Sequence, residues 1–335
     1  MVYNKYIGII GGTGTIGSII VKYLLQLQTH FHVLIGGRRS IKEISMSTFY
    51  NSERLKYNQM NYNNDVELDN FCSQCLLVIN AVGPSFKIND KIALHALRNN
   101  CHYIDIGGYG ILRDLLKPYE KSIEAQKLCF IIGVGWMPGI SGVFSKTIIE
   151  THLNSPENTN FNIYYGAVDN WSYSSTYDLA ASSMGKTRSY VYSHGKEIQV
   201  SPFRYTHHKF FPFIGHKKIC MPSFDEQLTQ LATSLKQIRK ISTFIMLNDY
   251  ISMGKFMFIK IFYKHNLNKA TLMLQDDYQR LVKKENKWGS VICQVSKIEP
   301  ERKIDTFYYL YTKNNLLYTA LPAVITCLLY TSPSP

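Results

Sequence analysis

The amino-acid sequence predicts an α/β protein that combines a doubly wound parallel sheet with a second, α+β domain. Over the first 150 residues, apolar strand-like runs alternate with helix-like segments, which is the pattern of a parallel sheet with crossover helices. A glycine-rich motif stands between the first run and the first helix. After an Asn/Ser/Pro-rich stretch at 154–160, tyrosine-rich strands begin. A chain of 335 residues exceeds what one compact core usually absorbs, so two domains are expected.

The parallel sheet is predicted from five apolar runs, at residues 6–10, 32–35, 76–81, 102–106 and 129–134. Helices are expected between and after them, at residues 16–26, 89–99, 112–126 and 143–152. The first helix carries an apolar stripe formed by Ile16, Ile19, Ile20, Tyr23, Leu24 and Leu27. Such a stripe is expected to pack on the sheet.

The second domain is predicted from strands at 162–167, 189–192, 290–297 and 303–311, with a helical part at 224–262. Within that part, residues 253–263 are apolar with lysines spaced through them. This segment fits a core helix under the sheet or a face that lies on a membrane surface. The expected domains are 1–150, then 151–317 for substrate or dimerisation, then the start of a return helix at 318–326.

The last nine residues, 327–335, have an unusual origin in our interpretation. They can be encoded by a codon run that resembles the transposon-end adapter of sequencing libraries. We therefore expect a non-native tail and a gene truncated near Thr326, against the alternative of an ordinary frayed terminus.

The chain is basic, with 37 Lys+Arg against 24 Asp+Glu, which favours anionic partners. No nucleic-acid-binding motif accompanies this charge, so nucleic acid is not expected as a partner. The N-terminus lacks a signal peptide, and the seven cysteines suit reduced core thiols, so we place the chain in the cytoplasm. The CxxC formed by Cys72 and Cys75 has no second pair, and no metal is expected there. A looser group in an expected loop, formed by His207, His208, His216 and Cys220, is interpreted as solvated.

A G-x-G-x-x-G motif, formed by Gly12, Gly14 and Gly17, follows the first strand and opens the first helix. In this context Gly12 permits a tight turn and Gly14 lets the backbone approach a pyrophosphate. Gly17 allows the helix to pack closely on the strand, so that the helix N-terminus faces the phosphates. The motif therefore predicts a Rossmann-type dinucleotide-binding domain.

The second strand ends at Arg38 and Arg39, where an NAD-binding domain would carry Asp or Glu for the ribose. Guanidinium groups can bind a 2′-phosphate through two charged hydrogen bonds. The pair therefore favours NADP over NAD, with two solvated arginines as the alternative. The exit of the next strand, residues 80–84, would border the nicotinamide-side ribose, and its small residues permit close approach.

Short-chain dehydrogenases need a Tyr-x-x-x-Lys pair on one helical face. The three matches fall in expected strands, turns or a loop, which disfavours that family: Tyr192 with Lys196, Tyr205 with Lys209, and Tyr309 with Lys313. The chain instead resembles the saccharopine dehydrogenase (reductase)-like oxidoreductases. The likeness rests on residues 9–17, 36–38, 78–84, 101–105 and 133–140, with residues 318–323 resembling the return helix of that family.

This resemblance implies an NADP(H)-dependent oxidoreductase that reduces or forms a secondary amine between an amino acid and a keto acid, or acts on a carbonyl carbon. The cofactor would be held by Gly12, Thr13, Gly14, Thr15, Ile16, Gly17, Arg38, Arg39, Ala81, Val82 and Gly83, with Trp136 against the nicotinamide. Met137 stands where many relatives have Asp before Pro-Gly, a departure that argues against saccharopine itself as the substrate.

Asp105 and Tyr109 are the candidate catalytic residues, because they follow a sheet strand and could place a donor on the developing charge. The alternatives are a backbone-bonding turn residue for Asp105 and a packed aromatic for Tyr109. Ser175, Thr176 and Arg188 are candidates for binding a substrate carboxylate near a helix N-terminus, with plain N-capping as the alternative. A homodimer is expected. The competing function is a non-catalytic NADP-binding or membrane-surface protein of the same fold.

Overall fold

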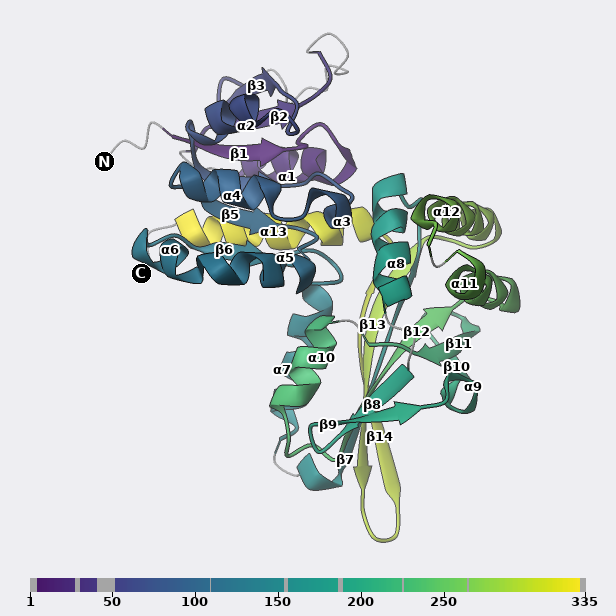
Figure 1. The fold of residues 1–335 in the computed structure, drawn as a ribbon. Coiled ribbons are helices and arrows are strands. Elements are labelled where there is room, and N and C mark those ends of the chain that lie inside the picture. The colour runs from purple at the N-terminus through teal and green to yellow at the C-terminus, as the bar shows by residue number, and fades with distance from the viewer. Residues whose placement is uncertain are drawn as a thin grey trace. The chain divides into compact units, whose positions relative to one another are not determined.

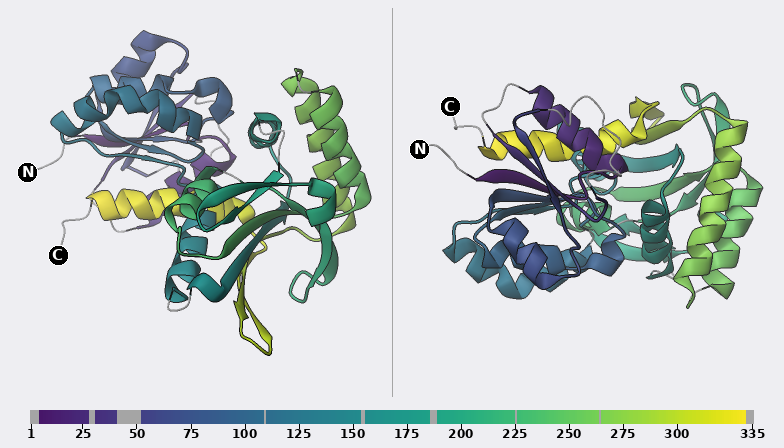
Figure 2. Two further views of the ribbon diagram at one scale, coloured as in Figure 1. Left: turned by 60° about the horizontal axis from the view of Figure 1, so that its bottom comes forward. Right: turned by 90° about the horizontal axis from the view of Figure 1, so that it is seen from above.

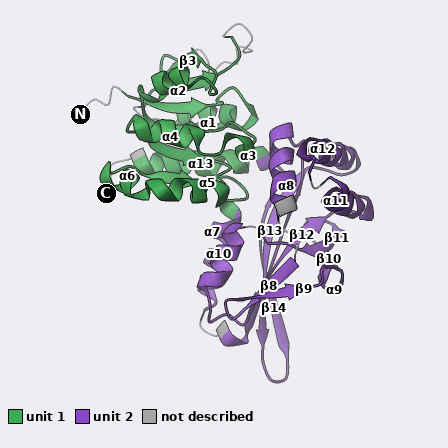
Figure 3. Cartoon of the chain, in the orientation of Figure 1, with its two compact units in different colours: residues 1–140, 316–335 green, residues 141–315 purple. Residues whose placement is uncertain are grey.

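The computed structural model describes residues 5–27, 31–40, 52–108, 110–153, 156–185, 189–224, 226–263 and 265–331. The chain divides into two compact units, coloured separately in Figure 3. Unit 1 consists of Met1–Ile140 and Leu316–Pro335, and unit 2 of Ser141–Asn315. Each unit contains its own sheet.

Unit 1 is built on a six-stranded sheet in which every pairing is parallel (Figure 1). Its strands are β1 (Tyr6–Ile10), β2 (Val33–Gly37), β3 (Leu55–Gln59), β4 (Cys75–Asn80), β5 (His102–Asp105) and β6 (Phe130–Ile132). Their order in the sheet is β3-β2-β1-β4-β5-β6. Strands β2 and β3 are added on one side of β1, and β4, β5 and β6 are added on its other side. This is the Rossmann order, and the predicted fold class is confirmed.

Helices cover both faces of this sheet. They are α1 (Thr15–Gln26), α2 (Asp65–Cys72), α3 (Ser85–Ile88), α4 (Lys91–Arg98), α5 (Gly110–Leu116), α6 (Glu120–Ala125) and α13 (Asn315–Thr331), with a 3₁₀ turn at Lys117–Tyr119. One apolar cluster joins α2, α4 and α5 to the sheet through residues such as Phe71, Ile92 and Leu112. The opposite cluster joins α1 and α13 to it through Leu24 and Val324. The four inner strands, β1, β2, β4 and β5, are therefore buried on both faces, as their continuous apolar runs predict.

Unit 2 contains a mixed sheet of eight strands, seen from two further sides in Figure 2. They are β7 (Thr159–Val168), β8 (Ser189–Ser193), β9 (Lys196–Val200), β10 (His207–Phe211), β11 (His216–Pro222), β12 (Lys240–Leu247), β13 (Trp288–Ile298) and β14 (Lys303–Thr312). The main path is β10-β11-β12-β7-β13-β14, with β8 and β9 attached to β12. Only the β12–β7 pairing is parallel among the described strands of this sheet. The predicted second α+β domain is confirmed.

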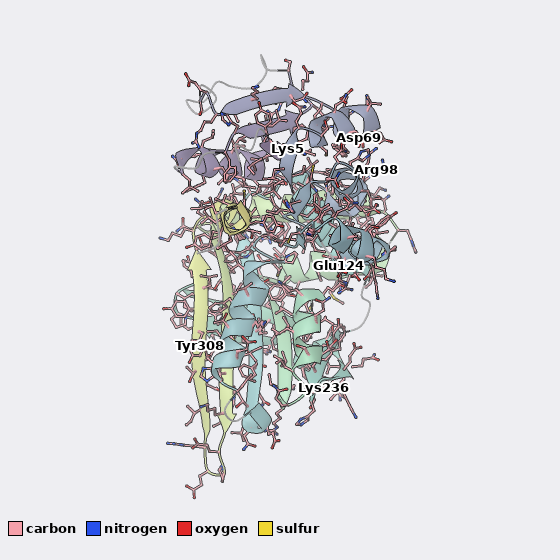
Figure 4. The ribbon with its side chains drawn as sticks, turned by 90° about the vertical axis from the view of Figure 1, so that its left-hand side faces the viewer. Lys5, Asp69, Arg98, Glu124, Lys236 and Tyr308 are labelled. Atoms are coloured by element: carbon pink, nitrogen blue, oxygen red, sulfur yellow. The ribbon has the colours of Figure 1, made fainter. Side chains whose placement is uncertain are left out.

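The helices of unit 2 are α7 (Ile140–Thr151), α8 (Tyr173–Gly185), α9 (Pro202–Tyr205), α10 (Glu226–Ser234), α11 (Tyr250–Phe262) and α12 (Leu267–Lys284). The segment after α7 is tied to β14, where the Nε2 atom of His152 lies 2.7 Å from the hydroxyl of Tyr308. Figure 4 labels Tyr308 on β14, beside α7. Ser141 at the other end of α7 hydrogen-bonds to Gln227 of α10. These contacts explain why the units divide at residue 140 and α7 packs with unit 2.

Several predicted elements differ from the structure. β3 and α2 were not expected, and the predicted helical part at 224–262 contains the strand β12. Residues of β12 are buried from Ile241 to Leu247 on both faces of the strand, so the sequence shows no alternation of apolar and polar residues by which to separate strand from helix. The histidine group lies on the β10–β11 hairpin rather than in a loop, and His207 pairs with Cys220 across it.

No helix among the described ranges is both long and apolar enough to cross a bilayer.

Candidate cofactor site

The turn after β1 is packed so closely against its neighbours that Gly11 and Gly12 have no room for a side chain. Gly11 has a φ of 84°, a conformation that side chains disfavour, and a Cβ there would lie 2.8 Å from Val82. A Cβ at Gly12 would lie 2.8 Å from Ile35 of β2. The turn thus packs against the ends of both neighbouring strands. The sequence motif predicts the tight turn at Gly12, but the residue with the left-handed backbone is Gly11, one position earlier.

The N-terminus of α1 is open to a ligand. Gly14 is its N-cap residue, and no side-chain hydrogen bond from that residue caps the helix. The first backbone N–H groups of a helix have no partners within the helix and carry partial positive charge. A Cβ at Gly17 would lie 2.2 Å from the carbonyl oxygen of Gly11, so this glycine brings helix and turn together. The arrangement fits a pyrophosphate at the backbone of Gly14, Thr15 and Ile16.

The two arginines after β2 have different surroundings. Both are exposed, but the Nη2 atom of Arg39 donates a hydrogen bond to the carbonyl oxygen of Thr13 at 2.5 Å. The hydroxyl of Tyr57 on β3 donates to the carbonyl oxygens of Gly37 (3.0 Å) and Arg39 (2.5 Å). The side chain of Arg38 has no hydrogen bond or ion pair with the described residues. Arg38 is therefore free to reach a phosphate beside the turn.

Residues 81–83 follow β4 and border the glycine turn. The N–H of Ala81 donates to the carbonyl oxygen of Ile10 at 2.9 Å, which continues the pairing of β1 and β4 beyond both strands. The N–H of Val82 donates to the side-chain oxygen of Asn80 at 3.0 Å. Asn80 is 2% exposed and so fixes the direction in which this loop leaves the sheet. Ala81, Val82 and Gly83 thus lie at the carboxyl ends of the strands, where ligands of this fold bind.

Asp105 ends β5 and is the centre of a buried polar network. Its Oδ2 atom accepts hydrogen bonds from the hydroxyl of Tyr103 (2.6 Å) and the amide of Asn80 (2.8 Å). Its Oδ1 atom accepts one from the N–H of Gly108 at 2.6 Å. Burial raises the pKa of Asp105, and the hydrogen bonds from Tyr103, Asn80 and Gly108 act in the opposite direction. Burial and the nearby carboxylate also raise the pKa of Tyr103.

This geometry favours a backbone-bonding turn residue, the alternative considered for Asp105 from the sequence. Asp105 is only 2% exposed, and its three partners belong to the fold. Its role in catalysis stays a prediction. Tyr109, the second candidate, lies outside the described residues. Sequence reasoning missed Asn80 and Tyr103 as partners; their only sequence signal is a polar atom at or near the end of an apolar strand.

A small pocket adjoins the network at the carboxyl ends of β4 and β5. It is lined by Asn80, Ser85, Phe86, Ile88, Asn89, Asp105, Gly108, Ile111 and Leu112. Polar atoms of the network therefore meet an apolar wall from α3 and α5.

Trp136 lies half-buried in the turn between β6 and α7. Its ring meets that of Tyr318 from α13 edge to face, with centroids 5.9 Å apart. The turn is closed by a hydrogen bond from the N–H of Gly135 to the carbonyl oxygen of Pro138 (3.0 Å). Trp136 is therefore fixed by unit 1 itself, and its contact with a nicotinamide stays a prediction.

The candidate substrate residues lie at the start of α8. The N–H of Ser175 donates to the hydroxyl of Ser172 at 3.2 Å, and the hydroxyl of Thr176 donates to the carbonyl oxygen of Ser172 at 2.9 Å. Thr176 is fully buried. These contacts are those of helix capping, the alternative that the sequence left open. Arg188 lies outside the described residues, so the predicted carboxylate site stays a prediction.

The thiols of the CxxC pair lie in the core of unit 1. Burial raises the pKa values of Cys72 and Cys75 well above the ordinary range, and that of Cys101 beside them to about 11. Such thiols are inert at neutral pH. Within the parts of the chain that the structure describes, no three His, Cys, Asp or Glu side chains are grouped so as to hold a metal ion.

Comparison with known proteins agrees with this geometry. Residues 7–129 match the family described as the saccharopine dehydrogenase NADP binding domain. No curated protein matches the chain in sequence. Among solved structures, the chain resembles apo saccharopine dehydrogenase (L-Glu forming) from Saccharomyces cerevisiae, with a TM-score of 0.66 and 12% identity. That match covers 97% of this chain and 91% of the other.

Two further structures align more weakly, with TM-scores below 0.5. They are an engineered D-amino acid dehydrogenase bound to NADP⁺ (TM-score 0.46, 11% identity, 95% of this chain and 86% of that one) and the C. glutamicum DAP dehydrogenase in complex with DAP (0.45, 11%, 96% and 86%). The predicted resemblance to saccharopine dehydrogenase-like NADP-binding proteins is confirmed, and so is the prediction of NADP as the cofactor of the matched domain.

Proposed function

We propose that this protein is an NADP-dependent oxidoreductase that acts on a small amino or keto acid. The reacting carbon belongs to an imine or secondary amine, or to a carbonyl group. The observation that carries the proposal is the glycine turn of unit 1 at the N-terminus of α1, beside which the Arg38 side chain has no partner among the described residues, in a domain that matches an NADP-binding family. The likeness in fold to a saccharopine dehydrogenase over 97% of the chain supports it.

The residues of unit 1 have distinct parts in this proposal. The backbone at Gly14, Thr15 and Ile16 binds the pyrophosphate, and Arg38 binds the 2′-phosphate through charged hydrogen bonds. Arg39 holds the turn by its bond to the carbonyl oxygen of Thr13. When bound, NADPH supplies a hydride to the carbon of a C=N or C=O group.

Asp105 acts as a positioning residue in this account. It binds the N–H of Gly108 and, through Asn80, sets the path of residues 81–83 along the nicotinamide side of the site. Orientation of this kind can supply much of the acceleration of a hydride transfer. Ser175, Thr176, Tyr109 and Arg188 remain the candidates for contacting the substrate, and Trp136 for packing on the nicotinamide.

The test is a two-substrate assay with the intact chain. We expect NADPH consumption only when a 2-keto acid and an amino acid are supplied together, with a secondary amine as product by mass spectrometry. In the reverse direction, the amine and NADP⁺ should give NADPH and the two acids. Consumption with a keto acid alone would identify a carbonyl reductase. Tight NADPH binding without turnover on any pair would favour the non-catalytic alternative.

A further inference from the structure

The outer face of α11 is apolar and uncovered within unit 2. Figure 1 places α11 beside α12 at the margin of that unit. Five large apolar side chains of the helix are between 40% and 66% exposed: Tyr250, Ile251, Phe258, Ile261 and Phe262. A surface helix of a soluble protein normally turns such residues inward and charged ones outward. Contiguous exposed apolar patches of this kind mark interaction sites.

These side chains form one continuous stripe. At 100° per residue, the five of them and the exposed Gly254 fall within about 120° of the helix circumference. None of the six is charged. The opposite side of α11 supplies the buried contacts, through Ser252, Phe256 and Ile259. The helix therefore has two apolar faces, one used by the core of unit 2 and one uncovered.

The helix is fixed in this orientation by polar contacts. Asp249 caps its first turn by accepting from the N–H of Ser252 at 2.8 Å, and Arg280 of α12 binds the same carboxylate at 2.7 Å. Lys255 pairs with Asp276 of α12 at 2.7 Å. Because these contacts with α12 fix the rotation of α11, the stripe is held facing away from the core of unit 2.

The charges around the stripe indicate what covers it. Residues 250–275 contain no Asp or Glu, but they contain Lys255, Lys260, Lys264 and Lys269. Lys255 is already paired with Asp276, whereas Lys260 and Lys269 have no ion pair with the described residues, and Lys269 is exposed in the first turn of α12. The ammonium of Lys260 lies 5.1 Å from the ring centroid of Phe256. Two copies of such a face would repel one another, whereas an apolar surface with negative charge attracts it.

We propose that α11 docks unit 2 onto a bilayer surface that contains anionic phospholipid. The aromatic and aliphatic stripe enters the boundary between headgroups and acyl chains, and Lys260 and Lys269 bind the headgroups. This is the arrangement of an interfacial amphipathic helix, which lies in the plane of the surface. The proposal does not depend on the reaction proposed above, since it rests on unit 2 alone.

The test is vesicle flotation of the full chain, with vesicles of equal parts phosphatidylserine and phosphatidylcholine or of phosphatidylcholine alone. We expect flotation with the phosphatidylserine vesicles that fades as salt rises, because salt screens the lysines. The double variant Phe258→Ser/Phe262→Ser should bind these vesicles at least about tenfold more weakly. Phe203→Ser is the matched control, since Phe203 is 78% exposed on α9, and it should float as the natural sequence does.

A second variant, Lys260→Gln/Lys269→Gln, tests the charge separately and should lose the preference for phosphatidylserine. Both double variants replace side chains at the surface of unit 2, and circular dichroism checks that they fold. Equal flotation of the natural chain and the Phe258/Phe262 variant would overturn the proposal. An absence of flotation of the natural chain would also overturn it. If, in that case, light scattering shows a dimer for the natural chain and a monomer for the Phe258/Phe262 variant, the stripe binds a second copy of the chain and not a bilayer.

Discussion

A hydrogen bond between Arg39 and Thr13 joins the end of β2 to the glycine turn after β1. The guanidinium of Arg39 donates to the carbonyl oxygen of Thr13 at 2.5 Å, although 26 residues separate them in the sequence. This bond gives Arg39 a structural contact, whereas the Arg38 side chain has none with the described residues and remains the candidate for binding a ligand. The two adjacent arginines therefore differ in role, and that of Arg39 is structural. Single substitutions of Arg38 and Arg39 distinguish the two roles.

The contact between Gly17 and the turn predicts opposite effects for two Gly→Ala substitutions. In Gly17→Ala, the new Cβ would lie 2.2 Å from the backbone oxygen of Gly11, so turn and helix must separate. We expect a loss of about 1–3 kcal/mol in the free energy of unfolding and weaker NADPH binding. In Gly254→Ala, nothing lies within 4 Å of the new Cβ, and the helix should gain about 0.5–1 kcal/mol.

Thermal denaturation of both variants and NADPH titration measure these effects. A Gly17→Ala protein as stable as the natural chain, with unchanged affinity, would show that the turn is looser than described.

The buried network around Asp105 predicts that stability and cofactor affinity change together. Tyr103→Phe removes one donor and should cost about 1 kcal/mol, while Asp105→Ala leaves three buried donors without an acceptor and should cost about 3 kcal/mol. Both variants should also bind NADPH more weakly, because residues 81–83 and 106–108 lose their support. Asp114→Asn, at an exposed position on α5, should change stability by less than about 0.5 kcal/mol.

Asp105→Asn separates positioning from proton transfer. If Asp105 were the proton donor of the reaction, this variant would bind NADPH normally and lose turnover. The positioning role instead predicts that affinity and melting temperature fall in parallel.

The ion pair of Asp249 with Arg280 predicts a pH-dependent part of the stability of unit 2. Burial alone would raise the pKa of Asp249, but hydrogen bonds from Arg280 and Ser252 outweigh it and hold the pKa well below its usual range. A lowered pKa contributes stability above the unfolded value, near 4, and loses it as pH falls through the folded value. Asp249→Asn keeps an N-cap residue and removes the charge.

We expect Asp249→Asn to cost about 1 kcal/mol at neutral pH, since about a third of the aspartate is exposed and solvent screens the pair. The gap in melting temperature between the two proteins should narrow below about pH 4. A gap that stays constant down to pH 2 would contradict the assignment.

Local constraints were predictable from the sequence, and contacts between distant segments were not. The glycine motif could be placed because each glycine is required by a turn or a close approach within a few residues. β3 was missed because its sequence, Leu55–Gln59, is half-exposed at the sheet edge and carries no apolar run. Because β3 was missed, the role of Tyr57 was missed too. Its hydroxyl donates to the carbonyl oxygens of Gly37 and Arg39 at the end of β2.

The network at Asp105 shows the same limit. The position of Asp105 after an apolar strand indicated a functional or a turn residue equally well. The hydrogen bonds of its carboxylate come from Asn80 on β4 and Tyr103 on β5. Asn80 lies opposite Asp105 only once the two strands pair in the folded sheet. The helix α11 shows the converse case, because the sequence left its apolar residues as either core or surface. The structure divides them between the two faces.

The affinity of Arg38→Ala for NADPH and NADH tests the central claim most directly. Dissociation constants are measured by fluorescence titration for the natural chain, Arg38→Ala and Arg39→Ala. We predict that the natural chain prefers NADPH and that Arg38→Ala weakens NADPH about 10- to 100-fold while leaving NADH unchanged. Arg39→Ala should weaken both cofactors, because it loosens the turn at Thr13. A natural chain that binds NADH as tightly as NADPH, or an Arg38→Ala variant that keeps the preference, would contradict the account.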